Sequence, residues 1–307
     1  MPDTDTCVIH EKLLSRILEK KNKLDSIRPL PGDSLKKLNE EMRLLHTYHS
    51  NAIEGNTLTL SETKLVLEEG ITVGGKSLRE HLETTNNAKA FDYIEKIVGK
   101  KKKIDHITIQ KIHEIVNAGI LEEAGRYRTK NVRITGAKKT PPDWSKVVQL
   151  MDVLIENIEK SEKNPIETSA FLHHRFVEIH PFIDGNGRVA RLLTNLYLIG
   201  LGYSPIVIKT EDRTKYYRYL KAADSGNPGP FANFIAKAID ESFTLLLSIF
   251  GEEEELIPLK ELAHETPYSQ EYLSLRARQG ALDAVKLGKK WFSSKRAVKE
   301  YIGEYRR

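Results

Sequence analysis

The segment that most constrains this chain is residues 180–191, which read HPFIDGNGRVAR. Its Gly-Asn-Gly triplet stands directly before an apolar run that continues to Leu201. In a helix that starts after such a turn, the backbone N–H groups of the first turn have no intrahelical acceptors. These groups and the positive end of the helix dipole both favour a bound anion. The sequence therefore predicts an anion site at the start of a helix near Gly187.

Four side chains in this segment fit chemistry at a phosphate group. Arg188 and Arg191 lie three residues apart in the predicted helix, so both can lean toward one face and contact the same anion. Asp184 would repel a bare phosphate, but it can hold a Mg²⁺ ion that bridges phosphate oxygens. His180 precedes them, and an imidazole that titrates near neutral pH can act there as a general base. The pattern indicates a base beside a reacting phosphorus atom.

The segment resembles the signature of the Fic (filamentation induced by cAMP) family over its full length. The resemblance implies transfer of AMP from ATP to a Ser, Thr or Tyr hydroxyl of a target protein, which can be the chain itself. It implies that His180 deprotonates this hydroxyl, that Asp184 ligates Mg²⁺, and that Phe182 anchors the loop in the core. The hydroxyl would attack the α-phosphorus in line and pyrophosphate would leave. The residues implied in ATP binding are Gly185, Asn186, Gly187, Arg188, Arg191, Tyr216 and Tyr217.

The tyrosine pair lies in RTKYYRYL, which looks like the family's segment that lines the adenine pocket. Aromatic residues at this spacing are often core residues, so we expect either Tyr216 or Tyr217 to pack in the core. Family members often place an Asn shortly after the pair, where this chain has Asp224. A carboxylate there would alter the contact with the base, so the preference for adenine stays open at this point.

Residues 132–142 are expected to form a short β-hairpin. Their first residues favour an extended strand, Gly136 favours a turn, and two prolines end the segment. The hairpin resembles the family's flap, which adds a target segment as an extra strand so that its hydroxyl reaches the base. The implied partner is a protein. The residues assigned to the flap are Val132, Arg133, Ile134 and Thr135.

Upstream, the segment SNAIEGN resembles the family's inhibitory motif, in which a Glu follows a Ser or Thr after four residues. Here these residues are Ser50 and Glu54. A glutamate that pairs with Arg191 would take the partner of the γ-phosphate, and such charge-assisted pairs are strong polar contacts. We therefore expect an autoinhibited resting state. In some family members the same glutamate orients a water that removes AMP from the target, and the sequence does not separate the two roles of Glu54.

Helical periodicity dominates the rest of the chain and predicts a mainly α fold. Apolar residues recur at helical spacing in residues 11–45, in 107–116 and in 147–158. A chain of 307 residues should hold one large core and smaller units, because single cores rarely grow beyond about 250 residues. The expected domains are an N-terminal helical region with the inhibitory motif (1–77), a Fic helical bundle with its flap (78–250) and a small winged helix-turn-helix (251–307).

The C-terminal segment reads as helix, turn, helix and β-wing, and resembles the excisionase or MerR-like winged helix-turn-helix. Its second helix is expected over Ser269 to Gln279. From Leu256 onward there are eleven Lys and Arg against six Asp and Glu, which equals the net charge of +5 of the whole chain. Such a unit can bind DNA, but it can also serve in dimerisation or docking. The side chains that could meet DNA phosphates are Arg276, Arg278, Lys286, Lys289 and Lys290.

Two alternatives use these residues differently. A metal hydrolase could take its ligands from His173, His174, His180 and Asp184. It would leave both arginines unused, and the adjacent histidines point to different faces of a helix. The other alternative is a DNA-binding transcription regulator whose Fic core senses a nucleotide with little or no transfer.

The sequence carries no mark of a membrane or of export. No apolar run approaches the ~20 residues that span a bilayer. The first residues lack a basic region followed by an apolar one, and the single cysteine, Cys7, cannot close an internal disulfide. We therefore expect a cytoplasmic protein, and the family resemblance implies a homodimer.

Overall fold

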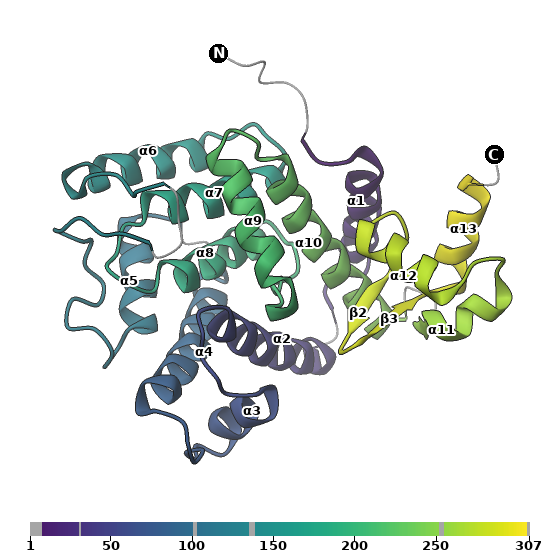
Figure 1. The fold of residues 1–307 in the computed structure, drawn as a ribbon, viewed down its shortest axis with the longest axis horizontal. Helices are drawn as coiled ribbons and strands as arrows, with labels where there is room; N and C mark the ends of the chain where they lie inside the picture. Colours follow the sequence, from purple (N-terminus) through teal and green to yellow (C-terminus); the bar gives the residue numbers. More distant parts are fainter. Residues whose placement is uncertain (1–7, 31, 101–102, 135–138, 252–254, 306–307) are drawn as a thin grey trace. The chain divides into compact units, whose positions relative to one another are not determined.

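The structure is a computed structural model that describes residues 8–30, 32–100, 103–134, 139–251 and 255–305. Helices dominate it, which confirms the mainly α fold (Figure 1). The strands among these residues form one antiparallel sheet, in the order β1-β3-β2. The chain packs as two compact units.

The first unit is built mainly from residues 39–235. It holds most of one long helix, the start of another and all helices between them. These elements are α2 (Gly32–Ile53), α3 (Leu60–Glu68), α4 (Leu78–Val98), α5 (His106–Val116), η1 (Trp144–Lys146), α6 (Val147–Glu159), α7 (Pro165–Ile179), α8 (Asn186–Gly200), η2 (Thr210–Asp212), α9 (Arg213–Asp224) and α10 (Gly229–Ile249).

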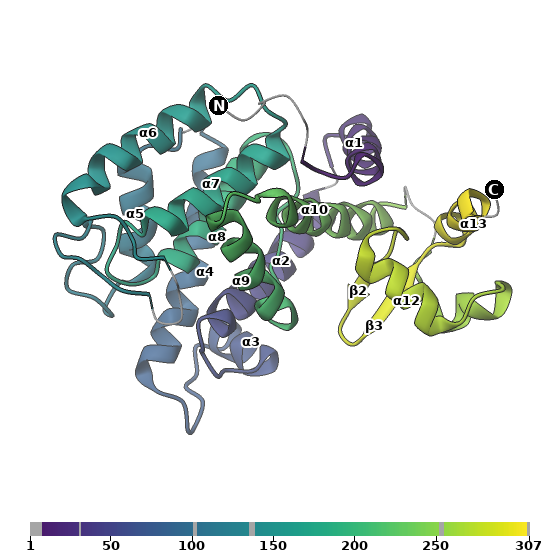
Figure 2. The same cartoon turned by 45° about the horizontal axis from the view of Figure 1, so that its top comes forward.

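Helix α8 is the central helix of this unit. It packs against α7, α4 and α5, and Figures 1 and 2 both show it among them. Because neighbours enclose it, nearly all of its side chains are buried, including those of Arg188 and Arg191. A buried guanidinium needs charged or polar partners close by, so the position of α8 dictates what its neighbours must provide.

Helix α4 provides some of these partners, and its start is fixed by a capping box. The Ser77 side chain accepts a hydrogen bond from the Glu80 N–H, and the Ser77 N–H donates to Glu80 Oε2 at 2.8 Å. Such a cap contributes about 1 kcal/mol. It orders the first two turns of α4, which carry Arg79 and Glu83.

The second unit contains residues 9–38 and 236–307. Its first helix, α1 (Glu11–Ser26), buries Leu13, Ile17 and Leu24, in agreement with the predicted periodicity. The end of α10 also belongs to this unit. The C-terminal elements are β1 (Ile257–Pro258), α11 (Leu259–Leu262), η3 (Ala263–Glu265), α12 (Gln270–Gln279), β2 (Val285–Leu287), β3 (Lys290–Ser293) and α13 (Lys295–Tyr305).

The predicted second helix of the C-terminal segment is confirmed as α12. Ser269 caps it by accepting a hydrogen bond from the Tyr272 N–H, and Gly280 ends it with a φ of +77°. The strands β2 and β3 then pair as a hairpin. This order of elements agrees with the expected helix, turn, helix and wing, whereas the assignment to the winged helix-turn-helix class stays a prediction.

Buried ion pairs join α1, α10 and the loop before β2 within this unit. Lys20 Nζ lies 2.8 Å from Asp240 Oδ1 and 2.7 Å from Asp283 Oδ1. Arg16 Nη2 lies 2.6 Å from Asp240 Oδ2. Lys20 and Asp240 are each only 3% exposed. Residues more than two hundred positions apart are thereby held together.

The predicted hairpin is absent from the described part of its segment. Residues 131–134 and 139–143 form no strand, while Thr135 and Gly136 lie outside the described residues. The Arg128 guanidinium donates to the carbonyls of Lys130 and Pro142, so side-chain hydrogen bonds fix both ends of the segment. The flap residues Val132, Arg133 and Ile134 accordingly lie in an irregular loop.

The two units also divide the chain at other points than the expected domains. Their boundaries fall at 38/39 and 235/236, within α2 and α10, and not at 77/78 and 250/251. The division into three domains therefore stays a prediction. Among the described residues, no helix combines the length and the apolar character that a bilayer crossing requires.

Candidate active site

His180 lies in the turn between α7 and α8. Its backbone is left-handed, with a φ of +52°, and it is the only non-glycine residue with positive φ in the described part of the chain. Its N–H donates to the Phe176 carbonyl at 3.0 Å, which closes the last turn of α7. A non-glycine residue in this conformation costs about 1–3 kcal/mol, so its surroundings must hold it.

Arg128 is the residue that holds this turn. Its Nε donates to the His180 carbonyl at 2.8 Å, and its backbone N–H donates to the Pro181 carbonyl at 2.9 Å. The same guanidinium donates to Lys130 O at 3.0 Å and to Pro142 O at 2.6 Å. Arg128 is buried. It therefore ties the backbone of His180 to both ends of the loop that the sequence assigns to the flap.

The His180 imidazole is arranged as a base. Its Nδ1 lies 3.2 Å from the Val177 carbonyl. Because a carbonyl can only accept, Nδ1 carries the hydrogen and the neutral ring keeps a lone pair on Nε2. Burial lowers the pKa of His180 and the Val177 carbonyl raises it; Arg128 lowers it further, Glu54 and Asp184 raise it, and the net shift is downward. The ring is neutral at pH 7 and can accept a proton.

Phe182 is fully buried, as its predicted role as anchor requires, and it stacks on His113 with ring centroids 3.7 Å apart. The Gly125 N–H donates to His113 Nδ1 at 2.8 Å. His113 Nε2 therefore carries the hydrogen and donates to the Asp184 carbonyl at 3.0 Å. Burial lowers the pKa of His113 to about 4, so the ring stays neutral. No sequence motif indicates His113, yet it fixes the loop from α7 to α8.

The first residues of α8 need their small or polar side chains for packing. Gly185 has a φ of +78°, and a Cβ there would lie 2.5 Å from Asn117 Nδ2. The Asn186 side chain accepts from the Phe182 N–H at 3.0 Å and donates to the Phe182 carbonyl at 2.9 Å. Its side-chain amide is therefore used inside the loop and holds the loop at the start of α8.

A carboxylate of the chain itself lies over the start of α8. A Cβ on Gly187 would collide with Glu54 Oε1 and would lie 3.3 Å from Arg191 Nη1. The Glu54 carboxylate thus stands where the sequence predicts an anion site. Its oxygen Oε1 lies where an oxygen of a bound phosphate is expected.

Arg191 is held by both residues of the inhibitory motif. Its Nε donates to Ser50 Oγ at 2.8 Å, and its Nη2 donates to the Ser50 carbonyl and to Glu54 Oε1, each at 2.8 Å. The predicted ion pair is therefore present. The side chain is only 3% exposed, and Nη1 has no hydrogen-bond partner among the residues that the structure describes. A buried unpaired N–H is costly, so Arg191 offers a donor to a ligand at Gly187.

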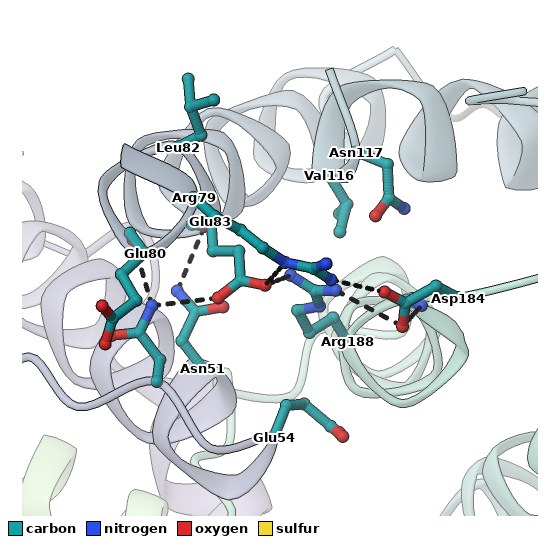
Figure 3. A network of polar contacts seen from close by, with 12 residues as sticks. Asn51, Glu54, Arg79, Glu80, Leu82, Glu83, Val116, Asn117, Asp184 and Arg188 are labelled. Atoms are coloured by element: carbon teal, nitrogen blue, oxygen red, sulfur yellow. Dashed lines mark hydrogen bonds and ion pairs between the residues drawn. The ribbon is translucent and has the colours of Figure 1, made fainter. Parts of the chain in front are cut away.

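A second charged network surrounds Asp184 (Figure 3). Arg188 Nη1 lies 3.2 Å from Glu83 Oε1, within ion-pair distance but without hydrogen-bond geometry. Arg188 Nη2 lies 3.8 Å from Asp184 Oδ1. Arg79 of α4 donates to Asp184 Oδ2 at 2.7 Å. The sequence indicates Asp184 and Arg188, but not the two α4 residues that contact them.

Of the predicted tyrosines, Tyr216 is the one that packs in the core. Its hydroxyl lies 2.8 Å from His173 Nε2, and His173 Nδ1 lies 2.9 Å from Thr194 Oγ1. Tyr217 is 40% exposed, with the Arg213 guanidinium 5.0 Å from its ring centroid. Of the two tyrosines, only Tyr217 is therefore accessible to the adenine of a nucleotide. The expectation that one of the pair packs in the core is confirmed.

The histidines do not converge on a metal. His173 is buried with both ring nitrogens engaged, and His174 Nε2 lies 2.8 Å from Asp224 Oδ1. In the part of the chain that the structure describes, no three His, Cys, Asp or Glu side chains form a group that could hold a metal ion. This contradicts a metal hydrolase built from His173, His174, His180 and Asp184. A Mg²⁺ shared with phosphates needs only one or two carboxylates, and Asp184, with 43% of its side chain exposed, fits that need.

Comparisons with known proteins agree with this geometry. A family model described as Fic/DOC family matches residues 103–198. The chain is 37% identical over 245 residues to "Protein adenylyltransferase Fic" of Nematostella vectensis, covering 78% of this chain and 57% of the relative. It is 34% identical over 253 residues to the protein of the same name from Drosophila persimilis, covering 82% and 50%. The chain spans about half the length of these curated relatives.

Solved structures show the same fold. Fic-1 from C. elegans is 30% identical with a TM-score of 0.69, and the match covers 78% of this chain and 71% of that chain. A Fic domain containing signaling protein from Bacteroides thetaiotaomicron is 29% identical with a TM-score of 0.72, covering 78% and 100%. A Fic family protein from Desulfovibrio desulfuricans shares the fold at 24% identity and a TM-score of 0.66, covering 96% and 98%.

Proposed function

The chain belongs to the Fic/DOC family, and on this premise we propose that it is a protein adenylyltransferase. It would move AMP from ATP to a Ser, Thr or Tyr hydroxyl of a target protein, its own chain included. The observation that carries the proposal is the start of α8, where Arg191 is buried with an unpaired Nη1 beside Gly187. A carboxylate of the chain itself already lies on this anion site, and a triphosphate would compete with it for the position.

In the proposed reaction, the phosphates of ATP lie along the first turn of α8. The backbone N–H groups there point toward the anion, and Arg191 and Arg188 add positive charge. Asp184 would hold Mg²⁺, which supplies charge neutralisation on the phosphate oxygens. Tyr217 is the exposed ring that would contact the adenine of ATP. Tyr216 is buried and packs in the core beside it.

His180 carries out the proton transfer. Its neutral Nε2 accepts the proton of the target hydroxyl, and the oxygen attacks the α-phosphorus in line. The bond between the α-phosphorus and the bridging oxygen breaks, and pyrophosphate leaves with that electron pair. The imidazolium then returns its proton to solvent. Catalysis rests mainly on positioning and charge neutralisation, so no covalent intermediate with the enzyme is needed.

Glu54 and Ser50 would act as the brake. While they hold Arg191, the γ-phosphate lacks its partner and ATP binds in an unproductive pose. Hydrogen bonds to charged groups contribute about 1.5–3 kcal/mol each, so loss of the Glu54 carboxylate should raise the transfer rate about ten- to a hundredfold. The second expected role of Glu54, orienting a water that removes AMP, stays a prediction.

The test is transfer of label from [α-³²P]ATP, compared with labelled CTP, GTP and UTP. Glu54→Gly should raise self-modification, and His180→Ala in the same background should abolish it. Glu69→Gly removes another exposed glutamate outside the site and serves as the matched control. Self-modification that does not rise in Glu54→Gly would contradict the brake, and activity that survives His180→Ala would contradict the base.

The alternative of a nucleotide-sensing regulator predicts a different outcome. No variant would then transfer label, and the protein would bind DNA with an affinity that falls steeply with salt. Among the residues proposed to meet DNA, Arg276 is already engaged with the Tyr272 hydroxyl and with Gln279, while Arg278, Lys289 and Lys290 are exposed. DNA contact, a homodimer and a cytoplasmic location stay predictions.

A further inference from the structure

The proposed metal ligand is already paired with an arginine from another helix. Arg79 Nη2 donates to Asp184 Oδ2 at 2.7 Å, and the Gly185 N–H donates to Asp184 Oδ1 at 2.6 Å. Both carboxylate oxygens therefore have a donor, as Figure 3 shows for the arginine side. A metal ion that binds through Oδ2 competes with the Arg79 guanidinium for this oxygen and for its negative charge.

The charges around Asp184 are balanced without a metal. Arg79 and Arg188 carry two positive charges, and Asp184 and Glu83 carry two negative ones. A divalent cation entering alone would meet two guanidinium groups and no excess of negative charge. Nucleotide phosphates would supply that excess.

Arg79 can release Asp184 without leaving its helix. A different nitrogen, Nε, donates to Glu83 Oε1 at 3.1 Å, one turn further along α4. The Arg79 side chain is 56% exposed, so it has room to turn away from Asp184. Arg188, by contrast, is buried and stays beside Glu83 and Asp184. The exchange of Arg79 for a metal therefore breaks a single contact.

We propose that Arg79 competes with Mg²⁺ for Asp184, so that a nucleotide carrying its metal has to displace this arginine and binds less tightly for that reason. The inference rests on the proposed role of Asp184 as the metal ligand. It differs from the brake at Glu54, which acts on the γ-phosphate through Arg191. Arg79 instead limits the gain in nucleotide affinity that the metal provides.

The size of this effect follows from the exposure of the pair. Exposed ion pairs contribute only about 0–1 kcal/mol, which corresponds to at most about a fivefold change in an equilibrium. Loss of Arg79 makes the Asp184 carboxylate available to the metal, which strengthens nucleotide binding when metal is present. Without metal, the Asp184 carboxylate then repels the phosphates, which weakens nucleotide binding. Both effects increase the ratio of nucleotide affinities with and without metal.

The experiment measures ADP binding by isothermal titration calorimetry in saturating Mn²⁺ and in EDTA. All variants carry Glu54→Gly, because the Glu54 carboxylate lies over Gly187, where the phosphates of ADP would bind. The readout is the ratio of the two Kd values, which is the coupling between metal and nucleotide. In Arg79→Gln this ratio should rise about two- to fivefold, and in Arg79→Lys it should rise less. Lys89→Gln, which neutralises an exposed residue about 15 Å further along α4, should leave it unchanged.

Two outcomes separate this inference from its premise. If Asp184→Asn abolishes the coupling while Arg79→Gln leaves it at the value of the Glu54→Gly parent, the competition by Arg79 is wrong and the metal site stands. If Asp184→Asn keeps the full coupling, Asp184 is not the metal ligand and both ideas fail. Thermal unfolding of each variant, with an unchanged midpoint expected for the exposed Arg79, excludes a folding defect as the cause.

Discussion

At the scale of single residues, Arg128 has the largest influence that no motif indicates. It holds the carbonyl of His180 in a left-handed turn, and its charge lowers the pKa of the His180 imidazole. The first effect concerns the position of the base and the second concerns its protonation. Different substitutions can separate them.

We predict that Arg128→Gln raises the pKa of His180, because it removes a positive charge that disfavours the imidazolium. The base works only when it is neutral, so activity is present above this pKa. A raised pKa therefore moves the acid limb of the kcat/KM profile to higher pH. The measurement is a pH profile in the Glu54→Gly background.

The control for this prediction is Arg128→Lys, which keeps the charge and loses the fork that binds several carbonyls. It should lower kcat, on the order of tenfold or more, because the base is misplaced. The acid limb of its kcat/KM profile should coincide with that of the Glu54→Gly parent. An acid limb of Arg128→Gln that coincides with the parent would show that the charge of Arg128 does not act on His180.

The site could be predicted from the sequence where its residues follow one another. His180, Asp184, Arg188 and Arg191 share one turn and one helix, so their spacing alone indicates their chemistry. Arg128 and His113 act on backbone carbonyls that lie far away along the chain. Backbone acceptors leave no trace in the side-chain pattern, and for this reason neither residue could be found.

At the scale of elements, α4 is the helix whose start matters most for the site. Its capping box at Ser77 orders the turn that carries Arg79, and Arg79 contacts Asp184. Helical periodicity over 107–116 and 147–158 predicted helices α5 and α6. It could not predict that the described residues of 132–142 form no strand, although Arg128 donates hydrogen bonds to the carbonyls of Lys130 and Pro142 beside them.

We predict that Ser77→Ala lowers the free energy of unfolding by about 1 kcal/mol, because the N–H groups of the first turn lose their acceptor. Fraying of this turn should also weaken the contact of Arg79, so the coupling of metal and ADP should rise as in Arg79→Gln, by a smaller factor. Urea unfolding and calorimetry measure the two effects.

The matched control is Thr59→Ala, which removes the same kind of capping box from α3. Helix α3 contributes no residue to the network around Asp184. A similar loss of stability with unchanged coupling is therefore expected. Equal coupling in both cap variants would mean that the start of α4 has no special influence on Asp184.

At the scale of the whole molecule, the division into two units could not be predicted. The expected boundaries followed composition, whereas the second unit joins residues 9–38 with 236–307. The contacts responsible include the buried pair of Lys20 and Asp283, which are 263 residues apart. Nothing local in the sequence indicates that these two residues meet.

We predict that Lys20→Met lowers the free energy of unfolding by about 3–5 kcal/mol, because Asp240 and Asp283 lose their buried cationic partner. The neighbouring Lys21→Met removes a more exposed pair with Asp25, and loss of that pair should change stability by less than about 1 kcal/mol. Urea unfolding compares the two. Equal losses would show that burial does not set the strength of the Lys20 pairs.

The carboxylate over Gly187 gives the site an inhibitor that cannot diffuse away. A tethered group of this kind has an effective concentration of about millimolar or above, so a nucleotide at a much lower concentration would not displace it. The enzyme would then respond weakly to its own substrate. It would respond strongly to any partner that withdraws residues 50–54 from the start of α8. The ATP concentration and the release of the Glu54 carboxylate would then be controlled independently.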